Sequence, residues 1–209
     1  MKKENKMRKI KLALIISTTA SLLFLSGCAD KVQRIDMNND KGDQVIGLDY
    51  RDFNQAAGEA TQSLLKSSAL NTKDGNRVIL VISDIRNDTM QHIDTDQLIK
   101  KIRIELLNSG KVFVTTALGS STDSMNKEAR KLKDNADFNQ KTVQKEGTLM
   151  APDMSLSGKI LQRNINMGNA KQQVEYYFML SLTDIKTGLA LWEGETVIGK
   201  RGSGKSVAW

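Results

Sequence analysis

The most restrictive feature of this 209-residue chain is a strict alternation of residue types in its last quarter. Every second residue from 174 to 182 is apolar: Val174, Tyr176, Phe178, Leu180 and Leu182. Successive side chains of a β-strand point to opposite faces, so a period of two predicts a strand with one buried face. The residues between them are expected to point away from the core.

Two further strands are expected on either side of this one. Pro152 introduces the first, and residues 189–198 form the other. The turn-forming stretches 167–171 (MGNAK) and 184–188 (DIKTG) separate the three strands, as hairpin turns do. The first strand has its own apolar face, made of Met154, Leu156 and Ile160. These patterns predict an antiparallel three-stranded meander.

Apolar residues at helical spacing dominate three earlier segments. Phe53, Ala57, Ala60 and Leu64 indicate a helix for which Asp52 is a plausible cap. A second helix is expected around residues 98–106, begun by Asp94 or Asp96 and ended by Gly110. A third amphipathic helix is expected from Met125, Ala129, Leu132 and Ala136, with a further turn or two in residues 138–145.

Two β-rich runs flank the second of these helices. VILVI (78–82) has no polar residue, as expected of a strand that is covered on both faces, and KVFVT (111–115) is a shorter run. The order strand–helix–strand predicts a parallel βαβ unit. The predicted fold class is therefore α/β (α+β): a mixed β-sheet with one parallel βαβ unit and a C-terminal antiparallel meander, flanked by helices.

The N-terminus has the pattern of an export signal. A basic segment is followed by 14 apolar or small residues (12–25) and then by LSGC, which ends at Cys28. This pattern predicts a signal peptide in residues 1–27, begun at Met1 or Met7. Cys28 is the only cysteine, which excludes an intrachain disulfide. We expect Cys28 to carry a lipid, residues 28–47 to form a flexible tether, and residues 48–209 to fold as one domain.

The positive charge of the chain lies mostly in the predicted signal peptide. The whole chain has a formal charge of +7, and residues 1–27, with six Lys/Arg and one Glu, account for +5 of it. The remaining +2 gives no basic surface of the kind that nucleic-acid binding needs. We therefore expect no nucleic acid among the partners.

One stretch fits the phosphate-binding loop pattern. GKRGSGKS (199–206) contains the two glycines, the lysine and the serine at the required spacing. A phosphate site also needs a helix directly after the loop, and only three residues follow Ser206. We interpret the stretch as a solvated C-terminal tail and expect no nucleotide or other cofactor.

Candidate catalytic residues are few. His92 is the only histidine, it lies in a polar stretch, and no nucleophile motif accompanies it. Four aspartates occur close together in sequence without the spacing of a calcium loop: Asp84, Asp88, Asp94 and Asp96. Trp192 and Trp209 are expected to pack rather than to bind sugar. The sequence predicts no catalytic or metal site.

Three stretches together resemble one protein family. They are VILVISDIRNDTMQHIDTDQLIKKIRIELLNSGKVFV, APDMSLSGKI and VEYYFMLSLTDIKTGLALWEGE. With the cysteine motif, they are similar to LpoB, a family of outer-membrane lipoproteins that activate a bifunctional class A penicillin-binding protein. The resemblance covers roughly residues 48–209.

The resemblance implies a fold, a partner and a location. The fold would be similar to the N-terminal domain of TolB. The partner would be an accessory domain of the synthase in the periplasm, reached from a lipid anchor in the outer membrane, and the chain itself would not be an enzyme. Better-known members have a longer, proline-rich tether than residues 28–47 provide.

Two surfaces are candidates for partner binding. Arg163 and Tyr177 are each expected opposite the apolar face of their strand, so both can lie on one outer side. The other candidate is the predicted loop that contains Arg86, Asn87 and Asp88. The alternative function is that of a lipoprotein adaptor for another envelope machine, such as a secretion or transport complex; a glycan-cleaving enzyme is a third.

Replacing Cys28 with serine is expected to abolish lipid attachment, because a serine provides no thiol for acylation. The measurement is incorporation of radiolabelled palmitate, with processing followed by gel mobility. Equal labelling of the serine variant and the unaltered chain would contradict the lipoprotein interpretation.

Overall fold

The computed structural model describes residues 34–37, 39, 42, 44–119 and 122–206. Cys28 and Trp209, and with them the expected signal peptide and lipid site, lie outside these residues. Residues 41–209 make up one unit, to which all the described helices and strands belong. Within the described part of the chain, no helix has the length and apolar character needed to cross a membrane.

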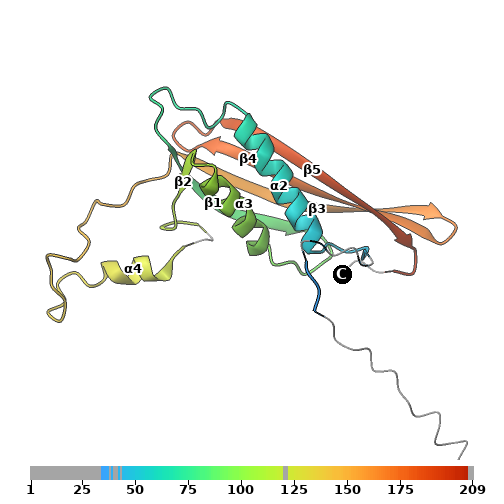
Figure 1. Ribbon diagram of the computed structural model, residues 1–209, viewed down its shortest axis with the longest axis horizontal. Coiled ribbons are helices and arrows are strands. Elements are labelled where there is room, and N and C mark those ends of the chain that lie inside the picture. The colour runs from blue at the N-terminus through green and yellow to red at the C-terminus, as the bar shows by residue number, and fades with distance from the viewer. Residues whose placement is uncertain (1–33, 38, 40–41, 43, 120–121, 207–209) are drawn as a thin grey trace, which may run out of the picture. The chain divides into compact units, whose positions relative to one another are not determined.

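A five-stranded mixed sheet forms the centre of this unit (Figure 1). The strand order is β2-β1-β3-β4-β5, with β1 (Val78–Asp88) parallel both to β2 (Val112–Val114) and to β3 (Met154–Gly168). The strands β3, β4 (Lys171–Asp184) and β5 (Ala190–Ser203) are antiparallel neighbours. The predicted βαβ unit and the predicted meander are both confirmed.

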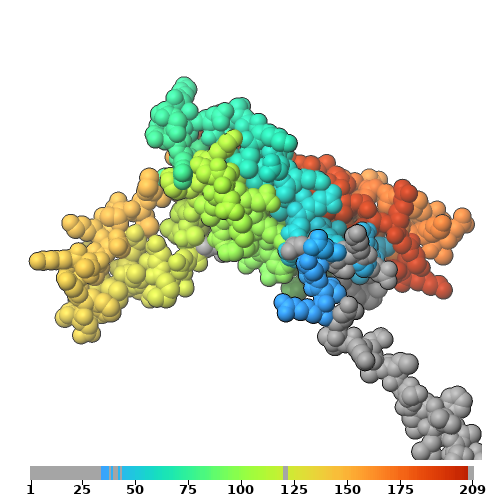
Figure 2. Space-filling view, in the orientation of Figure 1, coloured from blue at the N-terminus to red at the C-terminus, as the bar shows by residue number. Residues whose placement is uncertain are grey.

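Two helices cover one face of the sheet (Figure 1). They are α2 (Tyr50–Lys66) and α3 (Asp96–Asn108). Seen from the helix side, the β3–β4 hairpin projects past them (Figure 2). Burial along β3 accordingly decreases after Ile160. Among the described helices, α2 and α3 thus pack on one face of the sheet, and none packs on the other.

The core lies between this helix layer and the sheet. The aromatic rings of Phe53 and Phe178 meet edge to face with centroids 6.0 Å apart, a geometry that aromatic pairs prefer. All five alternating apolar residues of β4 are buried, as the sequence predicts. The other fully buried large side chains are Leu64, Leu80, Ile82, Ile102, Leu106, Leu156, Ile160, Val78 and Val112.

Helix starts differ from the sequence expectations by a few residues. Asp49, not Asp52, caps α2, and the two carboxylates form a reciprocal capping box. Asp52 is the third helical residue and is buried. At α3 the N-cap is Thr95, while the side chain of Asp94 accepts a hydrogen bond from the backbone N–H of Asp96. Gly110 does end α3, with φ of 69°.

The expected third amphipathic helix is the clearest error of the sequence analysis. Only α4 (Ser124–Arg130) forms, and none of its residues is buried. Asp134 adopts a left-handed φ of 63°, which a continuing helix does not allow. Leu132 and Ala136 therefore lie in turns, the first partly buried and the second exposed, and residues 138–145 form turns, bends and irregular structure rather than helix.

Two local conformations allow the long meander to form. The turn between β3 and β4 places both Asn169 (φ 49°) and Ala170 (φ 55°) in the left-handed region, which suits a tight hairpin. Gly158 in β3 lies beside the irregularity in β1, and a Cβ there would overlap Met179 and Leu180. Only glycine fits at this position.

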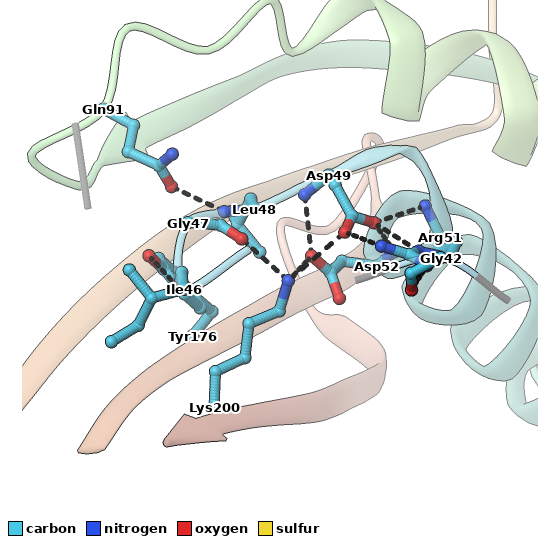
Figure 3. Close-up of polar contacts among 10 residues, drawn as sticks. All are labelled: Gly42, Ile46, Gly47, Leu48, Asp49, Arg51, Asp52, Gln91, Tyr176 and Lys200. Atoms are coloured by element: carbon cyan, nitrogen blue, oxygen red, sulfur yellow. Dashed lines mark hydrogen bonds and ion pairs between the residues drawn. The ribbon is translucent and has the colours of Figure 1, made fainter. Parts of the chain in front are cut away.

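The apparent phosphate loop is part of a strand. Residues 199–203 belong to β5, so the prediction of a solvated tail is wrong for them. The side chain of Lys200 points into the fold and is 8% exposed. Its ammonium lies 2.5 Å from Asp52 Oδ2 and donates a 2.7 Å hydrogen bond to the carbonyl of Gly47 (Figure 3). Lys200 is therefore a structural residue, whereas Lys205, the lysine of the phosphate-loop pattern, is exposed beyond the end of β5.

The hydrogen bond from Lys200 to Gly47 and two others attach the end of the expected tether to the folded domain (Figure 3). The Tyr176 hydroxyl donates to the Ile46 carbonyl (3.3 Å), and Gln91 accepts from the Leu48 backbone N–H (2.9 Å). Burial, together with the negative charge of Asp52, raises the pKa of Tyr176 to about 12. We call residues 46–48 the strap.

Replacing Lys200 with methionine is expected to lower the free energy of unfolding by about 3 kcal/mol, because the buried Asp52 carboxylate loses its counter-ion. Chemical denaturation is the measurement. Lys205→Ala serves as the matched control, since Lys205 is exposed, and no change is expected. Micromolar ATP binding that is lost on Lys205→Ala would contradict our interpretation of the glycine-rich stretch.

Candidate functional site: the open face of the sheet

The face of the sheet opposite α2 and α3 displays a set of polar and apolar side chains. They alternate along β3, β4 and β5 with the buried residues, and each is exposed or partly exposed. We call them the open face: Lys159, Leu161, Arg163, Glu175, Tyr177, Met179, Glu193, Glu195, Val197 and Arg201. The two residues that the sequence analysis selected, Arg163 and Tyr177, both belong to it.

An apolar row crosses the middle of the open face. Leu161 lies directly opposite Tyr177, and Tyr177 lies directly opposite Val197. Val197 keeps 47% of its surface exposed. Directly opposite residues on one face of an antiparallel sheet have Cβ atoms about 5 Å apart. The three side chains therefore form one continuous apolar strip.

Hydrogen bonds join the polar side chains next to this strip. The Tyr177 hydroxyl donates to Glu175 Oε2 (2.7 Å), and Gln173 donates to Glu175 Oε1 (2.6 Å). Arg201 in turn donates to Gln173 Oε1 (2.7 Å). Arg163 lies opposite Glu175 in the ladder. The orientation of the tyrosine is thus fixed by its neighbours.

These contacts shift two pKa values. The hydrogen bond to Glu175, helped by burial, raises the pKa of Tyr177, while Arg163 works in the opposite direction. The hydrogen bonds from Tyr177 and Gln173 lower the pKa of Glu175, and the positive charge of Arg163 contributes to the lowering. At neutral pH the cluster therefore holds a neutral phenol, a carboxylate and a guanidinium side by side.

The second candidate segment is a strand end rather than a loop. Arg86, Asn87 and Asp88 are the last residues of β1, so the prediction of a loop is wrong for all three. Arg86 donates two hydrogen bonds to Asp88 Oδ2, at 2.7 and 3.0 Å. Arg86 lies opposite Lys159 and Asp88 opposite Leu161. This ion pair therefore continues the open face onto β1.

Asn87 is placed differently from its two neighbours. It lies opposite the buried Ile160, on the helix side of the sheet. Its side chain accepts from the backbone N–H of Thr89 (3.0 Å) and donates to the carbonyl of Gln91 (2.8 Å). Asn87 therefore shapes the turn after β1 and is separated from Arg86 and Asp88.

The remaining candidate residues form no reactive group. His92 is exposed, as are Asp84, Asp94 and Asp96. Among the described residues, no three His, Cys, Asp or Glu side chains are close enough together to hold a metal ion. Outside the core, the open face is a cluster of side chains that interact with one another.

A comparison with family sequence models identifies the group to which this sequence belongs. The model of the peptidoglycan-synthase activator LpoB matches residues 52–198. The chain belongs to this family. The match includes β1, β3 and β4 in full and most of β5, and thus almost all of the open face. No curated protein sequence matches the chain.

Solved structures of the LpoB family are among those similar to this chain. The C-terminal domain of LpoB from Escherichia coli is 14% identical, with a TM-score of 0.42, over 70% of this chain and 98% of that domain. The corresponding Salmonella enterica domain is 16% identical, with a TM-score of 0.39, over 70% and 98%. An NMR structure of E. coli LpoB is 14% identical, with a TM-score of 0.38, over 85% and 81%.

Sequence reasoning missed most members of the open face. It selected Arg163 and Tyr177 by chemical type, but Leu161 and Val197 become apparent only when the strands are placed in register. The alternation in residues 193–201 contained a usable signal, since Thr196, Ile198 and Lys200 are buried and the residues between them are exposed. The inward-pointing lysine concealed that signal.

Replacing Glu175 with glutamine is expected to lower the pKa of Tyr177 toward its ordinary value, because the charged acceptor that favours the neutral phenol is removed. The measurement is a pH titration of the tyrosine ring carbons by NMR. Glu193→Gln is the matched control: this carboxylate is on the same face but bonds to Ser181. An unchanged titration of Tyr177 in Glu175→Gln would contradict the hydrogen bond.

Proposed function

We propose that this protein is an outer-membrane lipoprotein that binds a bifunctional class A penicillin-binding protein and stimulates both glycan polymerisation and peptide crosslinking. Membership of the peptidoglycan-synthase activator family is the observation that supports this proposal most strongly. We further propose that the open face, with Arg86 and Asp88 beside it, is the docking surface. The part of the synthase that binds there would be an accessory domain in the periplasm.

The composition of the open face supports its proposed role in binding. Interface hot spots are enriched in tyrosine and arginine, which provide a large contact area and specific hydrogen bonds. Here Tyr177 is the middle residue of the apolar strip, between Leu161 and Val197, and Arg163 lies next to the strip on β3. Strands hold side chains more rigidly than loops do, so little ordering entropy is lost on docking.

Activation of this kind requires no chemistry from the activator. A protein that binds the active conformer of an enzyme more tightly than the resting conformer shifts the population toward the active one. A tenfold shift needs only about 1.4 kcal/mol of differential binding. We accordingly propose that the chain is not an enzyme and uses no cofactor.

The lipid anchor and the tether determine where such docking can occur. We propose that Cys28 holds the protein on the periplasmic side of the outer membrane. Residues 29–45, which precede the strap, could extend by roughly 55–60 Å when stretched, although a flexible chain of this length averages about 20–25 Å. The tether is thus short, and the folded domain would provide much of the reach toward the inner membrane.

The variants Arg163→Glu and Tyr177→Ala are each expected to weaken synthase binding about tenfold, or about 1.4 kcal/mol. Lys100→Glu is the matched control, since Lys100 is exposed on α3, on the side of the sheet away from the open face. The measurement is the affinity of folded, purified protein for the synthase, together with the melting temperature. Unchanged affinity in both variants would exclude the open face, and a large loss of stability in Tyr177→Ala would show that this residue is structural.

The identity of the partner can be tested separately. Capture from detergent-solubilised envelopes is expected to recover a class A synthase with the unaltered chain and less of it with Arg163→Glu. Recovery of a secretion or transport complex instead would favour the adaptor function. Digestion of purified sacculi by the protein alone would reveal a glycan-cleaving enzyme and overturn the proposal.

A further inference from the structure

The strand β5 is a long edge of the sheet. It spans 14 residues, pairs with β4 on one side, and is the last strand in the sheet order. An edge strand presents backbone N–H and C=O groups that can pair with another strand. Native proteins usually protect such edges with short strands, bulges or inward-pointing charges.

The charge that would normally protect this edge is already neutralised. Lys200 points inward from β5, but its ammonium contacts Asp52 and the carbonyl of Gly47. The exposed side chains in the middle of the strand are Glu193, Glu195 and Val197, with Arg201 further along. Both signs of charge are therefore present on one face of the edge, on the two sides of an exposed valine.

We propose that β5 pairs with β5 of a second copy of this chain, antiparallel and centred on Val197. A two-fold axis at Val197 places this residue opposite itself and places Glu193 opposite Arg201 of the other copy. The axis generates this charge pair twice. Two five-stranded sheets would then join into one continuous sheet.

Steric complementarity favours the same arrangement. On the open face, Glu195 comes opposite Gly199. On the helix-covered face, Trp192 comes opposite Gly202, Gly194 opposite Lys200, and Thr196 opposite Ile198. Each of the three glycines of β5 thus lies opposite a larger residue. Within its own strand, the ring of Trp192 also lies over Gly194. In each copy, Ile46 packs against Gly202. Trp192 of the other copy would therefore have an apolar neighbour there.

Other registers are less complementary. An axis one residue earlier, at Thr196, leaves Glu193 opposite a glycine and pairs no opposite charges. An axis one residue later, at Ile198, pairs Glu195 with Arg201 but sets Gly194 against Gly202. Axes at Glu195 or Gly194 bring glutamates together, which destabilises a sheet. Val197 is therefore the centre that the sequence of β5 favours.

The pairing goes beyond the proposed function and does not depend on it. Both open faces would lie on the same side of the joined sheet. Two partner molecules could then be bound by one assembly, and weak binding to each would be strengthened by effective concentration. Arg163 and Tyr177 lie on β3 and β4, so they remain outside the pairing edge.

Charge reversal tests the pairing. The full chain, extracted in mild detergent, is expected to be dimeric at tens of micromolar by light scattering. Glu193→Arg and Arg201→Glu are each expected to weaken the dimer about tenfold, because like charges then meet twice. The double variant is expected to restore it. A monomer at hundreds of micromolar, or a dimer that none of these variants affects, would overturn the proposal.

Cysteine crosslinking tests the register in chains that remain folded. Val197→Cys is expected to form a disulfide-linked dimer on mild oxidation, since the two residues face each other across the axis. Glu195→Cys is the matched control on the same face, where the two copies of residue 195 are four residues apart along the strands. The unaltered chain, with Cys28 alone, gives the background. Equal crosslinking in all three, or crosslinking of Ile198→Cys only, would overturn a centre at Val197.

Discussion

The packing of α2 against one face of β4 and β5 is the contact on which the other parts of this domain depend. Three alanines of α2 are buried, and such small side chains let a helix lie close to a sheet. The edge-to-face pair of Phe53 and Phe178 fills the space nearer the start of the helix. Because α2 and α3 pack on this face of the sheet, the alternate side chains of the meander point to the other face. There they are available to bind a partner protein. Burial on one side and display on the other follow from the same alternation.

A buried charge is the least expected part of this packing. Taking an ammonium out of water is unfavourable by several kcal/mol unless it is paired and hydrogen-bonded. Lys200 meets both conditions through Asp52 and the Gly47 carbonyl, and Asp49 lies 3.6 Å away. Although burial acts to raise the pKa of Asp49, its hydrogen bonds with Arg51 and the positive charge of Lys200 outweigh this effect and lower it. Three residues at the start of α2 and one on the last strand are therefore mutually dependent.

Sequence patterns predicted the fold well where burial is one-sided and periodic. The alternation in β4 and the turn at 167–171 predicted the meander, and the apolar run 78–82, bounded by turn-forming residues, predicted β1. Prediction failed where a contact across the fold decides the outcome. Nothing local shows that Asp52 is the partner of Lys200, or that helix α4 ends at Arg130 for lack of a surface to cover. The open face was found only in part, since registers between strands are not encoded in either strand alone.

The strap has a mechanical consequence. Ile46 and Gly47 are bonded to side chains of β4 and β5, just before the chain turns into α2. A pull on the preceding residues would load Tyr176 and Lys200 through the strap, and it would load Arg51 in the first turn of α2 through the hydrogen bond that Arg51 donates to the Gly42 carbonyl (3.2 Å). Part of the force would thus pass directly into β4 and β5, which pair with each other along most of their length. The domain could then follow the thermal motion of the residues before the strap without the start of α2 carrying the whole load.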